Sequence, residues 1–173
     1  MRAFIAVRVA CLLGLVACGE STGPSTGATF FSYKSSPGEY VGAGESHRYA
    51  FGDGQWQAQA NATGQVERIS VSVIGLPGSA YWSLDFAAPP GQALAVGTYE
   101  AARRYPFQGS QPGLSVYGNS RGCNTLTGRF VVVALTLAPG NVVDRFQARF
   151  EQYCEGASPL LSGEISIAAN PWR

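Results

Sequence analysis

Apolar and polar residues alternate along several stretches of this chain, and the alternation limits the folds that it can adopt. Residues 69–73, 81–86 and 146–150 each place an apolar side chain at every second position, with polar or tyrosine side chains between. A period of two is typical of a β-strand that has one buried side and one solvent-facing side. Because no long stretch has the periodicity of an amphipathic helix, the sequence predicts an all-β protein.

Other stretches complete this prediction. Residues 130–137 are nearly all apolar and often β-branched, which is typical of a strand covered on both sides. A last strand is expected within 161–167, and Asp53-Gly54 predicts a hairpin turn. Shorter strands are expected at 30–33, 48–51, 55–60, 97–99 and 114–117. About nine short strands favour an antiparallel β-sandwich, with a β-barrel as the alternative. In either fold Trp56, Trp82 and Phe86 are in phase with apolar neighbours and are expected in the core.

The N-terminus is organised like a bacterial export signal. Arg2 and Arg8 come before an uncharged apolar segment, which ends in Leu15-Val16-Ala17-Cys18. This arrangement resembles the lipobox of bacterial lipoproteins, in which the cysteine becomes the first mature residue and carries fatty acyl chains. The resemblance implies a signal peptide over 1–17, lipidation of Cys18, and a protein anchored in the cell envelope, at the outer membrane or cell surface. The apolar segment is shorter than the ~20 residues of a membrane-spanning helix. An ordinary secretory peptide cleaved near the same place is the alternative.

The remaining chain divides into a tether and one domain. Residues 19–28 are small and polar, so residues 18–28 are expected to be a flexible tether that follows the lipidated cysteine. Residues 29–173 have the length of a single β-sandwich domain. Without Arg2 and Arg8, ten basic residues balance eleven acidic ones, and Lys34 is the sole lysine. This balance gives no basic excess for binding nucleic acid, and no cofactor motif is present.

Two further cysteines remain after the expected processing. An even pair in an exported chain predicts a disulfide between Cys123 and Cys154. Half of a metal site is the alternative, but the sequence has no C-x-x-C and His47 is its only histidine. A turn is expected at 138–141, and the two cysteines flank it at nearly equal distances. They are therefore expected to meet at the open end of one hairpin, whose strands can accommodate a bulge.

Several aromatic residues fit the core pattern less well. Such side chains can stack on a sugar or a peptide, because aromatic rings offer rigid contact area. Together with two polar residues, they form the set of candidate ligand-binding residues: Tyr81, Asp85, Tyr105, Phe107, Tyr117 and Arg121.

Three stretches, 82–108, 113–132 and 150–156, are similar to a β-domain of exported bacterial proteins that has a GCNTLTG…FEQ-x-CEG cysteine pair. The resemblance implies a β-domain and a disulfide, and it assigns no catalytic or binding residue. The polar residues of these motifs are Asp85, Arg104, Arg121, Asn124 and Glu155. The same residues could serve as hydrogen-bonding groups that hold turns.

Catalytic motifs are weak. Residues 118–122 match G-x-S-x-G, but the expected helix is missing and His47 lies upstream. The carboxylates to consider for hydrolysis are Asp85, Glu100, Glu151 and Glu155. The sequence therefore favours a non-catalytic binding module for a glycan or another protein. The alternatives are a purely structural envelope protein and a hydrolase of envelope or extracellular polymers.

Overall fold

The computed structural model describes residues 27–61 and 64–169, and these residues form ten strands and no α-helix. The strands are β1 (Phe30–Ser35), β2 (Ser46–Ala50), β3 (Gln55–Ala60), β4 (Arg68–Leu76), β5 (Ala80–Ala87), β6 (Gly97–Arg104), β7 (Gly113–Gly118), β8 (Leu126–Ala138), β9 (Val142–Cys154) and β10 (Leu161–Ile167). The expected signal peptide, Cys18 and most of the expected tether lie outside the described residues. Within the described part, no helix is long and apolar enough to cross a membrane.

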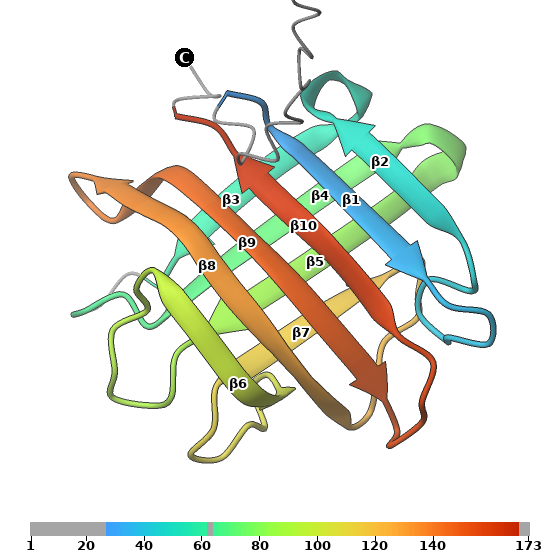
Figure 1. The fold of residues 1–173 in the computed structure, drawn as a ribbon. Coiled ribbons are helices and arrows are strands. Elements are labelled where there is room, and N and C mark those ends of the chain that lie inside the picture. Colours follow the sequence, from blue (N-terminus) through green and yellow to red (C-terminus); the bar gives the residue numbers. More distant parts are fainter. Residues whose placement is uncertain (1–26, 62–63, 170–173) are drawn as a thin grey trace, which may run out of the picture.

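All ten strands belong to one sheet, in the order β2-β1-β10-β9-β8-β6-β7-β5-β4-β3. The sheet curls over on itself and forms two layers (Figure 1). The first layer contains β2, β1, β10, β9, β8 and β6, and the second, which crosses behind it, contains β7, β5, β4 and β3. The prediction of an all-β, two-layered fold is confirmed. The sheet is mixed rather than fully antiparallel, because β6 and β7 run parallel where the first layer continues into the second.

The core lies between the two layers. Its largest fully buried side chains include Trp82, Phe86 and Phe130, and Phe86 lies 5.4 Å from Phe130, measured between ring centroids. Trp56 is also buried, at 8% exposure, so the three expected core aromatics are all confirmed. These residues occupy the apolar positions of the alternating stretches, which places the intervening polar residues on the outer faces.

Two local predictions are wrong. The Asp53-Gly54 turn does not join a hairpin, because β2 and β3 lie at opposite edges of the sheet. A short 3-10 turn at Phe51–Asp53 carries the chain between the layers, and the Asp53 carboxylate accepts a hydrogen bond from the backbone N–H of Ala50 at 2.7 Å. In β8, which was expected to be covered on both sides, Val131 and Val133 are only half-buried because that side faces solvent.

The hairpin between β8 and β9 is confirmed, and so is the disulfide at its open end. The Sγ atoms of Cys123 and Cys154 are bonded, and Cys154 pairs with Leu126 at the first position of β8. The register between the two strands shifts between Val132 and Ala134 and again between Thr136 and Leu137, and the two shifts cancel. The unequal spacing of the cysteines about the turn arises because Cys154 pairs with Leu126, whereas Cys123 lies in the segment before β8. The disulfide therefore fixes the start of β8 and the segment that precedes it.

Gln152 joins the two layers inside the core. Its side chain donates to the backbone carbonyl of Val116 and accepts from the backbone N–H of the same residue, both at 2.9 Å. Val116 lies in β7, and β7 pairs with β6 only through Gly113 and Leu114, which come before Val116. The amide of Gln152 thus satisfies backbone groups that no neighbouring strand reaches.

Candidate functional site

A cleft of about 460 Å³ opens on the outer side of the second layer, within the size range of small-molecule pockets. Its floor is made by the outward-facing residues of β5 and β7, and its walls are the segments that follow β6 and precede β8. The lining residues are Asp85, Arg104, Tyr105, Pro106, Ser115, Tyr117, Gly122, Cys123 and Asn124. Asp85, Ser115 and Tyr117 face outward because Leu84, Phe86, Leu114 and Val116 take the buried positions of the same strands.

Asp85 is the most buried charged group of the cleft, with 8% of its surface exposed. Its Oδ1 accepts a hydrogen bond from the Ser70 hydroxyl at 2.7 Å and lies 3.2 Å from Nη1 of Arg68. Burial raises the pKa of this carboxyl, and the hydrogen bond from Ser70 and the charge of Arg68 partly offset that rise. Both of these contacts are made by Oδ1, and within the described part of the chain Oδ2 accepts no hydrogen bond, which leaves acceptor capacity for a ligand.

Two aromatic rings flank the carboxylate, and each packs against a glycine. A Cβ at Gly113 would lie 3.0 Å from Cδ2 of Tyr105, and a Cβ at Gly122 would lie 3.2 Å from Cβ of Tyr117. A larger residue at either glycine would therefore crowd a tyrosine of the cleft, which would have to shift by a few tenths of an ångström. The Arg68 guanidinium lies 5.0 Å from the ring centroid of Tyr105, which holds Arg68 between the ring and Asp85.

The wall at 122–125 is held by several independent interactions. The disulfide fixes Cys123, and Nη1 of Arg104 donates to the backbone carbonyl of Asn124 at 3.3 Å, which joins the two walls. The Glu155 carboxylate accepts hydrogen bonds from the backbone N–H of Asn124 and from the Thr125 hydroxyl. The hydrogen bond from the Asn124 backbone is the main reason that the pKa of Glu155 lies below its usual value. These interactions hold the wall in one conformation.

The structure brings together three of the six candidate ligand-binding residues and separates the others. Asp85, Tyr105 and Tyr117 line the cleft. Phe107 lies beside it, 72% exposed, with the Arg104 guanidinium 5.1 Å from its ring centroid. Tyr81 holds the turn after β7, since its hydroxyl accepts a hydrogen bond from the backbone N–H of Ser120 at 2.7 Å.

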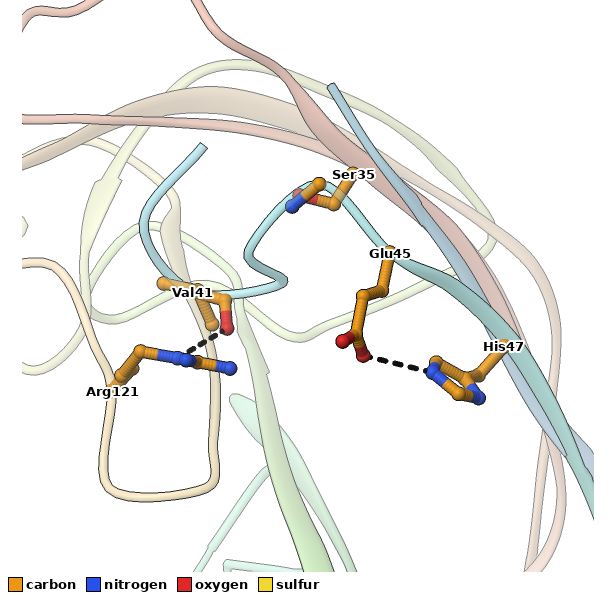
Figure 2. A network of polar contacts seen from close by, with 6 residues as sticks. Ser35, Val41, Glu45, His47 and Arg121 are labelled. Carbon is orange, nitrogen blue, oxygen red and sulfur yellow. Dashed lines mark hydrogen bonds and ion pairs between the residues drawn. The ribbon is translucent and has the colours of Figure 1, made fainter. Parts of the chain in front are cut away.

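Arg121 is not a cleft residue. Its Nε donates to the backbone carbonyl of Val41 at 3.0 Å, so it holds the loop between β1 and β2 (Figure 2). The same view shows His47 on β2, where its Nε2 lies at hydrogen-bond distance, 3.0 Å, from Oε2 of Glu45. His47 is exposed on β2, an edge strand of the sheet. In residues 27–61 and 64–169, no three His, Cys, Asp or Glu side chains form a group that could hold a metal ion.

The other carboxylates considered for hydrolysis lie away from Asp85. Glu100 and Glu151 both contact Arg129 on the outer face of the first layer, at 3.3 and 3.1 Å. Glu155 is engaged in holding the 122–125 wall. Among the lining residues of the cleft, Asp85 is the one carboxylate.

Sequence reasoning missed Arg68 and Ser115 as parts of this site. Both occupy outward positions of strands that pair with β5, next to Asp85, but the sequence does not reveal which strands are neighbours. Arg104 and Asn124 appear in the motifs of the resembling domain, and that was the available signal for them.

Fold and site together define a class: a two-layered β-domain with a polar, aromatic-walled cleft held by a disulfide. Comparison with protein-family models, with curated proteins and with solved structures gives no match to this chain.

Proposed function

We propose that this chain is a cell-envelope lipoprotein, attached through Cys18, whose β-domain binds a ligand in the cleft beside Asp85 without chemically changing it. The observation that carries the proposal is the convergence of Asp85, Tyr105 and Tyr117 from three separate segments on one cleft. A carboxylate with a free oxygen and two rings at its sides suits a polar organic ligand that has hydroxyl groups and at least one apolar face.

The position of the cleft supports display away from an anchor at the N-terminus. Phe30 begins β1 and pairs with Ser166 of β10. Ser166 pairs with Gln147 of β9, which pairs in turn with Ala134 of β8, so the start of β1 is level with Ala134. The cleft wall lies instead beside Leu126, at the other end of β8. At ~3.3 Å per residue, about 25 Å of strand separates these two ends. A tether before β1 would hold nearest to the membrane the end of the first layer that is remote from the cleft.

A binding screen with one cleft variant tests the proposal. The exported and processed protein, in a mild detergent, is applied to glycan and peptide arrays, and any hit is titrated by calorimetry. Tyr117→Ala is expected to weaken binding about tenfold, which is the loss expected for one aromatic contact of ~1.4 kcal/mol. Tyr40→Ala is the matched control, because Tyr40 is an exposed tyrosine of the loop between β1 and β2, outside the cleft.

The proposal fails if no array ligand binds, or if Tyr117→Ala and Tyr40→Ala bind every ligand as the parent protein does. Turnover of a bound ligand, detected as a change in its mass, would contradict the non-catalytic part of the proposal.

A further inference from the structure

The outer face of the second layer carries two rows of polar side chains that cross its strands and lead into the cleft. The paired positions of β3, β4, β5 and β7 form the first row: Gln59, Ser70, Asp85 and Ser115. The second row lies two residues along the same strands: Gln57, Ser72, Ser83 and Tyr117. Asp85, Ser115 and Tyr117 at the ends of these rows line the cleft, so the rows and the cleft form one continuous surface. We call these eight residues the hydroxyl–amide face.

The outer face of the first layer has a different character. One of its rows runs Lys34, Ser162, Glu151 and Arg129, and its neighbour contains Glu164 and Arg149. These rows contain both signs of charge, and Arg129 is paired there with two carboxylates. On the hydroxyl–amide face the one charged member is Asp85, which is paired with Arg68. The same sheet therefore has an ionic outer face in one layer and an almost neutral one in the other.

From this contrast we propose that the hydroxyl–amide face binds a neutral, linear polysaccharide, laid across the strands from β3 to the cleft. The inference rests on the proposed function and names its class of ligand. Serine hydroxyls and glutamine amides both donate and accept hydrogen bonds, as sugar hydroxyls do. Adjacent strands are ~4.8 Å apart, so each row spans about 14 Å and presents one polar side chain per strand. Tyr117 ends one row and provides a ring on which a sugar can stack.

The composition of the face argues against two other kinds of ligand. Protein interfaces are enriched in aromatic residues, Met and Arg and are depleted in Ser, whereas four of the eight members of this face are serines. Nucleic acids and anionic glycans require unpaired basic groups, and no member of the hydroxyl–amide face is basic. Of the two neighbouring arginines, Arg68 is engaged by Asp85, and Arg104 donates to the backbone carbonyl of Asn124 in the cleft wall.

Affinity electrophoresis tests the inference with named polymers. The processed protein is run in native gels that contain a neutral glucan, galactomannan or xylan, or the anionic polymer polygalacturonate. We expect at least one neutral polymer to retard the protein and polygalacturonate not to. Fragments of the retarding polymer should bind more tightly as they lengthen beyond the size that fills the cleft.

Charge-introducing variants locate the binding surface. Gln57→Glu combined with Ser72→Asp adds two charges to the hydroxyl–amide face, far enough from the cleft lining to leave it intact, and should weaken polymer binding at least tenfold. Ser32→Asp combined with Ser162→Asp adds the same charge to the outer face of the first layer, at half-buried strand serines, and should bind as the parent does. Unchanged melting temperatures show that both double variants are folded.

The alternative outcomes overturn the inference in distinguishable ways. If polymer binding survives Gln57→Glu with Ser72→Asp but is lost in Tyr117→Ala, the ligand is confined to the cleft; the proposed function then stands and the extended surface does not. Retardation by polygalacturonate alone, or by none of the polymers, excludes a neutral polysaccharide as the ligand. Binding to peptides alone on the arrays has the same consequence.

Discussion

At the scale of single residues, Asp85 links the chemistry of the cleft to the stability of the fold. Burial raises the pKa of its carboxyl in the folded protein above the value in the unfolded chain. The folded state therefore holds this proton more tightly than the unfolded state does. The contribution of Asp85 to stability is then largest at low pH, and it falls as the pH rises from the unfolded pKa through the folded pKa.

Asp85→Asn removes this titration and should reveal it. The difference in unfolding free energy between Asp85→Asn and the parent protein should shift in favour of the variant between pH 3 and pH 7. The shift is measured by urea unfolding at several pH values, and the pH dependence of all other groups cancels in the difference. A difference that is constant with pH would show that Arg68 and Ser70 balance the burial of the carboxylate, and one that moves in favour of the parent would show that they outweigh it.

The same scale shows what the sequence could tell about the site. Period-two alternation correctly assigned Asp85 to the outer side of its strand, and Tyr117, which fits the core pattern less well, also lies on the outer side. It could not show that Arg121 would bind the Val41 carbonyl, because that contact joins segments 80 residues apart in the chain. Similarly, nothing local to Arg68 indicates that its strand is the neighbour of β5. The sides of strands are encoded locally, whereas the gathering of residues into a cleft depends on strand order.

At the scale of elements, Gln152 is expected to be a main connection between the two layers. Gln152→Ala leaves the buried N–H and carbonyl of Val116 without partners, and it should lower the unfolding free energy by about 2–4 kcal/mol. Gln147→Ala on the same strand is the matched control. Gln147 is equally buried but donates to the side chain of Glu164 rather than to backbone, so its loss should cost about 1 kcal/mol. Chemical denaturation of both variants measures the contrast, and equal losses would argue against Gln152 as the special link.

Elements also differ in how far the sequence predicted them. The hairpin of β8 and β9 was predictable because its turn, its alternation and its cysteines all lie within one continuous segment. The connection between β2 and β3 was not, since Asp53-Gly54 forms a tight turn that is compatible with a hairpin and with a crossing between layers alike. Gly54 has a non-local reason to be glycine, because a Cβ there would lie 2.7 Å from the Ile74 carbonyl oxygen. The parallel pair of β6 and β7 likewise follows from the curling of the whole sheet rather than from a local motif.

At the scale of the whole molecule, the two outer faces differ in charge, and the two ends of the first layer differ in what lies beside them. The ionic face surrounds Arg129, the hydroxyl–amide face leads into the cleft, and β1 begins at the end of the layer that is remote from the disulfide. An anchor placed before β1 would leave the cleft and the face accessible to polymers outside the membrane. The proposed lipid anchor would suit this arrangement, because a tether of the expected length would keep the domain near the envelope.

The proposed attachment to the membrane depends on Cys18. Membrane affinity rises by ~0.8 kcal/mol for each buried CH₂ group, and one chain binds only marginally, so stable attachment requires the two or three chains that bacterial lipoproteins carry. Cys18→Ser should therefore move the protein from the membrane fraction to the soluble fraction of the exporting cell, as measured by fractionation and immunoblotting after a high-salt wash. Cys11→Ser is the matched control, because Cys11 lies within the segment expected to be removed, and it should remain membrane-bound. If Cys18→Ser stays in the washed membranes, attachment does not depend on this cysteine, and the cleft would have to be presented by some other means.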